Sequence, residues 1–88
     1  MIERDVTIRN RSGLHTRPAA TLVKTAARFQ AELFITKDGY EINGKSIIGV
    51  MTLAAEQGSV LSLRFEGLDE EDMATAVVQL FNEGFGEL

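Results

Sequence analysis

The chain has 88 residues, which is enough for one domain with one hydrophobic core, and hydrophobic residues make up 44% of it. It contains no cysteine, which excludes a disulfide framework and a thiolate metal site. Its formal net charge of −4 argues against a nucleic-acid binder, and no apolar run approaches the roughly 18 residues that a membrane span requires.

The charges are unevenly distributed along the chain. Residues 1–28 are net basic, whereas residues 66–88 carry acidic side chains and no basic ones. A basic surface attracts acidic protein partners and phosphate groups. Residues 1–5 lack the basic and apolar segments of a secretory signal. Together with the absence of cysteine, this favours a cytoplasmic protein.

The first predicted elements are a strand and a helix. Residues 2–8 alternate between apolar and polar side chains, which is typical of a half-buried strand. A polar turn over residues 10–13 follows, and residues 16–29 have the period of a helix. The apolar stripe of this helix comprises Ala19, Leu22, Val23, Ala26 and Phe29.

A hairpin and a short helix are predicted next. Asp38-Gly39 is a two-residue hairpin signal between the strands 32–37 and 40–42. Ser46 is predicted to cap a helix over residues 47–53, because a serine hydroxyl can accept a hydrogen bond from a first-turn N–H. The stripe expected for this short helix comprises Ile47, Val50 and Ala54.

A fourth strand and a last helix complete the chain. Residues 60–66 alternate again, and Asp69 with Asp72 is predicted to form a capping-box start of the last helix. Gly84 is predicted as the residue that ends this helix. With one apolar face per strand, this order favours a single α+β domain over residues 1–88, with an antiparallel sheet covered by helices on one side.

The only histidine and the only proline lie close together in the stretch from Gly13 to Ala20. Gly13 permits a left-handed turn, and Pro18 suits a first helical turn because its missing N–H has no partner to lose. His15 is therefore expected at a helix N-terminus, where unpaired N–H groups and the helix dipole favour negative charge. Arg17 adds a planar fork of donors. Because a neutral imidazole beside such donors can attack phosphorus, the stretch predicts that His15 carries a phosphoryl group.

Two stretches resemble those of a known family. The octapeptide Gly13-Leu14-His15-Thr16-Arg17-Pro18-Ala19-Ala20, residues 43–51 and the overall length resemble HPr, the histidine-containing phosphocarrier protein of the phosphoenolpyruvate:sugar phosphotransferase system. The resemblance implies an open-faced sandwich with antiparallel strand order 1-4-2-3 and three helices on one face. It also implies that Nδ1 of His15 accepts a phosphoryl group from phospho-enzyme I. An enzyme IIA domain would then receive the group for sugar uptake.

The resemblance gives further residues a role. Our own hypothesis for Arg17 is that it pairs with phosphoryl oxygens in the transfer complex and with carboxylates of the partner. Ser46 matches a regulatory serine that HPr kinase/phosphorylase phosphorylates, and a catabolite-control regulator is a further implied partner. A phosphate on Ser46 adds about −1.5 to −2 charges and would repel an acidic partner. The expected docking residues are Thr16, Ala20, Lys24, Ile47, Ile48, Gly49 and Met51; of these, Ile48 and Met51 lie off the stripe of the short helix and are expected to be exposed.

The function of His15 has alternatives. One histidine with no nearby acid cannot form a catalytic relay, and the scattered carboxylates give no spacing for metal ligands. We therefore expect a monomeric covalent carrier that other phosphotransferases act on, not an enzyme. We expect it to have no cofactor, no metal, and no nucleic-acid or membrane partner. A regulatory phosphocarrier of nitrogen or catabolite control, without a role in sugar transport, is one alternative. An interaction module in which His15 is inert is another.

Overall fold

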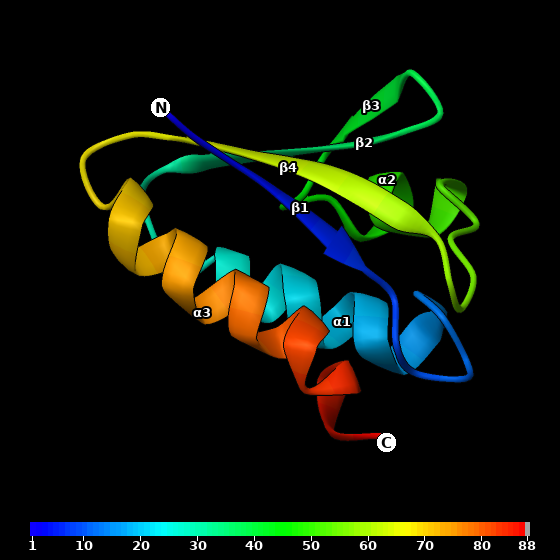
Figure 1. Ribbon diagram of the computed structural model, residues 1–88. Coiled ribbons are helices and arrows are strands. Elements are labelled where there is room, and N and C mark those ends of the chain that lie inside the picture. Colours follow the sequence, from blue (N-terminus) through cyan, green and yellow to red (C-terminus); the bar gives the residue numbers. More distant parts are fainter. Residues whose placement is uncertain (88) are drawn as a thin grey trace.

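The computed structural model describes residues 1–87 of the chain, which form four strands, three helices and one 3-10 turn (Figure 1). In chain order these elements are β1 (Ile2–Thr7), α1 (Thr16–Ala26), β2 (Glu32–Lys37), β3 (Tyr40–Asn43), α2 (Ile47–Thr52), β4 (Val60–Glu66), α3 (Glu70–Asn82) and the 3-10 turn η1 (Gly84–Gly86). The predicted order of strands and helices is confirmed. The sequence pattern does not predict η1.

The four strands form one antiparallel sheet in the order β1-β4-β2-β3, as the resemblance implies. The helices lie on one face of this sheet, and α1 and α3 run side by side beneath it (Figure 1). Because side chains alternate across a strand, β4 directs Leu61, Leu63 and Phe65 into the core. They pack with buried residues of the two long helices in one apolar cluster. The open-faced α+β sandwich is therefore confirmed.

The other face of the sheet is not covered by helices (Figure 1). The guanidinium of Arg64 lies there 4.4 Å from the centre of the Phe34 ring and pairs with Glu41 at 2.7 Å and Glu66 at 2.6 Å. Carboxylates otherwise dominate this outer face, because the strand alternation that buries the apolar residues turns the acidic ones outward. They belong to Glu3, Asp5, Glu32, Glu41 and Glu66.

Helix α1 ends at Ala26, three residues before the predicted end at Phe29. Contacts from distant elements fix the chain that follows. The carboxylate of Asp69 accepts hydrogen bonds from the backbone N–H groups of Gln30 at 2.9 Å and Ala31 at 2.8 Å. The Lys45 ammonium donates to the Phe29 carbonyl at 2.8 Å. These bonds hold the residues after Ala26 in a turn that the helical period of the sequence does not reveal.

The predicted capping box of α3 is wrong. Asp69 occupies the N-cap position, but its side chain makes no cap hydrogen bond because its carboxylate is bound to the turn after α1. Instead, Glu70 Oε1 accepts a hydrogen bond of 3.0 Å from the Gly67 N–H, just before the helix. The start of α3 therefore fixes the exit of α1 as well as its own first turn.

The end of α3 agrees with the prediction for Gly84. This glycine has φ +59° and follows the C-cap residue Glu83, which is where a left-handed residue commonly ends a helix. The chain then turns back through η1, and the Phe85 ring packs edge-on against Phe81 with a centroid distance of 5.0 Å. This turn directs Glu87, the residue after η1, towards the loop between β1 and α1.

Candidate functional site

The loop between β1 and α1 rests on Ala55, which lies beyond the end of α2. The Leu14 N–H donates a hydrogen bond of 2.9 Å to the Ala55 carbonyl, and the Leu14 side chain is buried. Gly13 has φ +66°, and a Cβ at this position would collide with the Ala55 carbonyl oxygen. The left-handed conformation and the close approach both require glycine. The predicted role of Gly13 is therefore confirmed, and its cause includes a contact with a distant segment.

His15 is the N-cap residue of α1 and is exposed. Its backbone is extended, with φ −81° and ψ −165°, and its carbonyl accepts the first helical hydrogen bond, from the Ala19 N–H at 2.8 Å. Its imidazole makes no capping hydrogen bond. Within residues 1–87, the backbone N–H groups of Thr16 and Arg17 have no acceptor. A free imidazole thus stands at a helix end that presents unpaired donors.

Arg17 is exposed on the first turn of α1, two residues after His15. This turn carries no acidic side chain, so the donors of the backbone and of Arg17 meet no negative charge within it. The nearby carboxylate is that of Glu87. Hydrogen bonds from Ser12 and Asn10 lower the pKa of Glu87, and the positive charge of Arg17 lowers it further. The loop before α1 therefore already holds one anionic group.

Three further residues belong to this site, although the sequence pattern does not indicate them: Asn10 and Ser12 in the loop, and Glu87 beside it. The Asn10 side-chain amide donates to the Gly13 carbonyl at 2.9 Å and to Glu87 Oε1 at 3.1 Å. The Ser12 hydroxyl donates to the same Glu87 oxygen at 2.6 Å. Residues 10–13 are a polar turn in the sequence, and nothing in that pattern reveals a fully buried asparagine or a partner near the end of the chain.

Ser46 is the N-cap of α2, as predicted. Its hydroxyl oxygen accepts a hydrogen bond of 3.0 Å from the Gly49 N–H, and its backbone is extended. The side chain is half-buried. Its regulatory phosphorylation stays a prediction.

Exposed apolar side chains gather on α2. Ile48 is 73% exposed, Met51 43% and Ile47 38%. The stripe predicted for this helix is therefore partly wrong: Ile47 and Ala54 are exposed, whereas Val50 and Leu53 are buried. The α2 patch is defined here as Ile47, Ile48 and Met51. Because exposed apolar side chains that cluster often mark protein contacts, the α2 patch is a candidate docking surface.

The α2 patch and the residues at the start of α1 lie on neighbouring elements, since α1 packs against α2. On α1, Thr16 and Lys24 are exposed and Ala20 is half-buried. On α2, Gly49 is half-buried between the exposed Ile48 and the buried Val50. The fold thus places both groups of predicted docking residues on two contacting helices.

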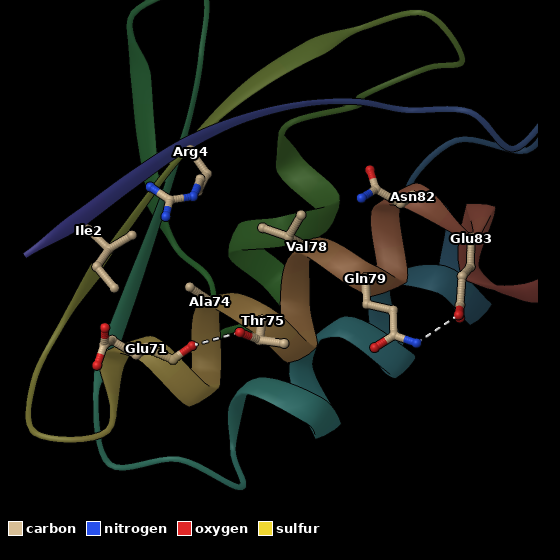
Figure 2. A pocket seen from close by; sticks show the side chains of 9 residues that line it. All are labelled: Ile2, Arg4, Glu71, Ala74, Thr75, Val78, Gln79, Asn82 and Glu83. Atoms are coloured by element: carbon tan, nitrogen blue, oxygen red, sulfur yellow. Dashed lines mark hydrogen bonds between the residues drawn. The ribbon is translucent and has the colours of Figure 1, made fainter.

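A groove of about 590 Å³ opens elsewhere, between the edge strand β1 and helix α3. Figure 2 shows Ile2 and Arg4 on its strand side and Ala74, Thr75 and Val78 on its helix side. None of the predicted site residues lines it. Arg4 occupies the position between Ile2 and Val6 that faces the core side of the sheet. A charge pointing inward from an edge strand discourages pairing with another strand, which gives Arg4 a structural role.

Two further properties bear on the class of site. Across residues 1–87, no three histidine, cysteine, aspartate or glutamate side chains are grouped so that they could hold a metal ion. In the same range, none of the helices has the length and apolar character needed to cross a membrane.

Comparison with known families gives a match over almost the whole chain. The family described as "PTS HPr component phosphorylation site" matches residues 2–83. The phosphocarrier protein HPr of Xylella fastidiosa (strain Temecula1) is 44% identical over 87 residues, covering 99% of this chain and 98% of that protein. The HPr-like protein Crh of Halalkalibacterium halodurans is 45% identical over 78 residues, covering 89% of this chain and 93% of that protein.

Solved structures agree with these matches. The crystal structure of HPr-C-His from Thermoanaerobacter tengcongensis has a TM-score of 0.97 and 44% identity, covering 100% of this chain and 99% of that chain. A crystal structure described as an HPr dimer from the same organism has a TM-score of 0.80 and 45% identity, covering 99% and 100%. The likeness extends over the full fold and includes the loop around His15 and helix α2.

Proposed function

Because the chain belongs to the HPr family of phosphocarrier proteins, we propose that His15 accepts a phosphoryl group from phospho-enzyme I and passes it to an enzyme IIA domain. Residues 1–88 act as one HPr-type domain in this cycle. The domain acts in the cytoplasm, and the process that it serves is sugar uptake. The observation that carries the proposal is the exposed imidazole of His15 at the N-terminus of α1, next to the unpaired amides of Thr16 and Arg17.

The chemical step moves one phosphoryl group between two nitrogens. The lone pair of His15 Nδ1 forms a bond to phosphorus while the N–P bond of the donor histidine breaks, and that bond's electron pair stays on the donor nitrogen. No phosphate is released. Phosphoryl transfer asks a protein chiefly for positioning and for stabilisation of charge. The amides of α1 and the guanidinium of Arg17 supply that stabilisation, since all of them are donors without an acid in the same helical turn.

The role of the chain in this cycle is that of a substrate for other phosphotransferases. His15 makes no hydrogen bond to a carboxylate within residues 1–87, so the site has no relay that would activate water for hydrolysis. The site therefore favours transfer of the phosphoryl group to an acceptor histidine over its loss to water.

Docking of the partners is proposed to use the α2 patch together with Thr16, Ala20, Lys24 and Gly49. The apolar side chains of the α2 patch supply contact area, and methionine adapts to partners of different shape. Arg17 and Lys24 attract acidic side chains of the partner. This division gives one surface on which enzyme I and the enzyme IIA domain bind in turn.

The test uses the purified chain with enzyme I and phosphoenolpyruvate. We expect the intact mass to increase by one phosphate, the phosphate to be lost in acid, and the increase to be absent in His15→Ala. Added enzyme IIA should remove the phosphate from the chain and gain it. An unmodified chain under conditions in which a known HPr is phosphorylated would contradict the proposal.

A second candidate function is regulation of nitrogen or catabolite metabolism without sugar transport. The 45% identity to the HPr-like protein Crh and the position of Ser46 at the start of α2 favour it. Under this function HPr kinase/phosphorylase phosphorylates Ser46, and a catabolite-control regulator binds the product. An ATP-dependent, acid-stable phosphate that is absent in Ser46→Ala would support this role. A phosphate that persists in Ser46→Ala would refute it.

The oligomeric state of the carrier is proposed to be monomeric. A related HPr has a structure described as a dimer, so the point needs its own measurement. Antiparallel pairing of two β1 edges centred on Arg4 would place Glu3 opposite a second copy's Asp5, and like charges directly opposite each other are destabilising. Light scattering at micromolar concentration should therefore give the mass of one chain, and a dimer mass would contradict this.

A further inference from the structure

Asn10 is the one buried polar side chain among the described residues 1–87, with an exposed fraction of 0%. Burying an amide is costly unless hydrogen bonds replace its contacts with water. The side-chain nitrogen of Asn10 has three acceptors around it: the Gly13 carbonyl at 2.9 Å, Glu87 Oε1 at 3.1 Å and the Ser12 hydroxyl oxygen at 3.3 Å. The two hydrogens of this nitrogen are shared among the three acceptors, whereas the buried side-chain oxygen of Asn10 has no hydrogen-bond partner within residues 1–87.

These acceptors also fix the orientation of the amide. A flip about the last side-chain bond would turn the Asn10 oxygen towards the Gly13 carbonyl and the Glu87 carboxylate, neither of which can donate. The flipped state would therefore set acceptor against acceptor in a buried place. The carboxylate of Glu87 contributes most to this preference, because it carries a charge and the Ser12 hydroxyl holds it in place at 2.6 Å.

Asn10 holds Gly13 from both sides. The Gly13 N–H donates to the Asn10 carbonyl at 3.2 Å, and the Gly13 carbonyl accepts from the Asn10 side chain at 2.9 Å. The next residue, Leu14, is fixed by Ala55. Both residues before His15 are therefore fixed, whereas the His15 imidazole itself makes no capping bond that would hold it.

We propose that Asn10 is a positioning residue for phosphoryl transfer at His15, and that the Glu87 carboxylate orients the Asn10 side chain for this task. The inference rests on the proposed function. In-line transfer needs the attacking nitrogen in a narrow range of distance and angle, and a misplacement of about 1 Å can cost about 100-fold in rate. Loss of the Asn10 donor frees the Gly13 carbonyl, and the loop then no longer holds His15 in one place.

The test separates the rate of transfer from the strength of docking. Enzyme I is first phosphorylated with phosphoenolpyruvate, and its transfer to the chain is followed by rapid quench as the concentration of the chain is varied. For Asn10→Ala we expect the maximal rate constant to fall about tenfold, with the half-saturating concentration within about twofold of that of the unaltered chain. The docking residues on α1 and α2 are unchanged in this variant, so binding is retained.

Glu87 variants test the orienting role. Glu87→Ala should lower the maximal rate constant about threefold, and Glu87→Gln, which keeps an oxygen acceptor, should lower it less. The double variant Asn10→Ala/Glu87→Ala should transfer at the rate of Asn10→Ala alone, because Glu87 acts through Asn10. Strict additivity of the two losses would overturn the orienting role. The Glu87 variants also test the proposal if Asn10→Ala does not fold, since Glu87 lies outside the apolar core.

The matched control is Asp69→Ala. Asp69 also holds a loop through two hydrogen bonds to the backbone, but at the opposite end of α1. It should lower thermal stability and leave the transfer rate within about twofold, when both variants are measured well below their unfolding temperatures. A maximal rate constant for Asn10→Ala equal to that of the control would overturn the inference, as would a loss confined to the half-saturating concentration. If the unaltered chain accepts no phosphate, the proposed function fails. If it accepts phosphate and Asn10→Ala transfers normally, the inference alone fails.

Discussion

The Ser12 hydroxyl donates a hydrogen bond of 2.6 Å to the Glu87 carboxylate across 75 positions of sequence. This bond, with that from Asn10 and the charge of Arg17, keeps the pKa of Glu87 below that of an ordinary glutamate. A carboxylate with a lowered pKa in the folded state stabilises that state above its unfolded pKa of about 4.3, and the contribution is lost as pH falls through the folded pKa.

We therefore expect Glu87→Gln to be less stable than the unaltered chain at pH 7, with a difference that shrinks below about pH 4.5. Urea unfolding between pH 3 and pH 7 measures this difference. Thr75→Ala, far from the loop, serves as the control whose difference should not change with pH. A Glu87→Gln difference that stays constant over this range would show that the carboxylate charge is not the stabilising group.

Ser46 caps α2 and directly precedes Ile47 of the α2 patch. Ser46→Ala removes the acceptor of the Gly49 N–H, and we expect a loss of about 1 kcal/mol in the free energy of unfolding. Ser46→Asp keeps an acceptor, so its stability should stay close to that of the unaltered chain. Its added charge should raise the half-saturating concentration for phospho-enzyme I about threefold or more. Equal stability of the two variants would contradict the capping role, and unchanged docking of Ser46→Asp would contradict the electrostatic one.

The α2 patch gives a prediction with a built-in comparison. Ile48 is 73% exposed, so Ile48→Asp should change stability by less than about 0.5 kcal/mol. It should nevertheless raise the half-saturating concentration for phospho-enzyme I about tenfold, because the apolar contact is lost. Leu68 is 100% exposed and lies outside the patch, so Leu68→Asp should leave docking unchanged. Equal effects of the two substitutions would exclude a specific patch.

Ala54 adopts a backbone conformation that favours glycine, with φ +49°. Ala54→Gly should raise the free energy of unfolding by about 0.5 kcal/mol, since relief of strain outweighs the added freedom of the unfolded chain. Ala27 has a right-handed helical conformation, with φ −66°, at the end of α1. Ala27→Gly should therefore be destabilising by about 0.5–1 kcal/mol. Thermal and urea unfolding of the two variants should show opposite signs, and a loss in both would contradict the assignment of strain to Ala54.

Features that depend on neighbouring residues could be predicted from the sequence. The alternation of residues 60–66 predicts a strand with Leu61, Leu63 and Phe65 facing inward, and these residues are buried. Ser46 and Gly84 have the predicted roles at helix ends, because capping is decided within one turn. The position of His15 at the start of α1 follows in the same way from Gly13 and Pro18.

Features that depend on distant residues could not be predicted in this way. Asp69 has the residue type and position of a cap, yet its carboxylate binds the turn after α1, more than thirty-five positions away. For the same reason, the helical period of residues 16–29 could not predict that α1 ends at Ala26. Asn10 and Glu87 are in contact because η1 turns the chain back. The residues around each of them form no pattern that would predict this contact. The strand order was predicted from the family resemblance. Alternation of apolar and polar residues identifies a strand but does not determine which strands are neighbours in the sheet.

The uncovered face of the sheet has a consequence for how partners approach. Its carboxylates greatly outnumber the single guanidinium of Arg64, while Arg9, Arg11, Arg17 and Lys24 lie in the loop before α1 and on α1, on the helix side. These basic side chains form a positive region along α1 and the loop before it, whereas the first turn of α3, on the same side of the sheet, is acidic. An acidic protein would be attracted to this positive region and repelled by the acidic face of the sheet, so that α1 faces the partner during the approach. Collisions would then be oriented before contact, and added salt would slow association while leaving the step at the imidazole untouched.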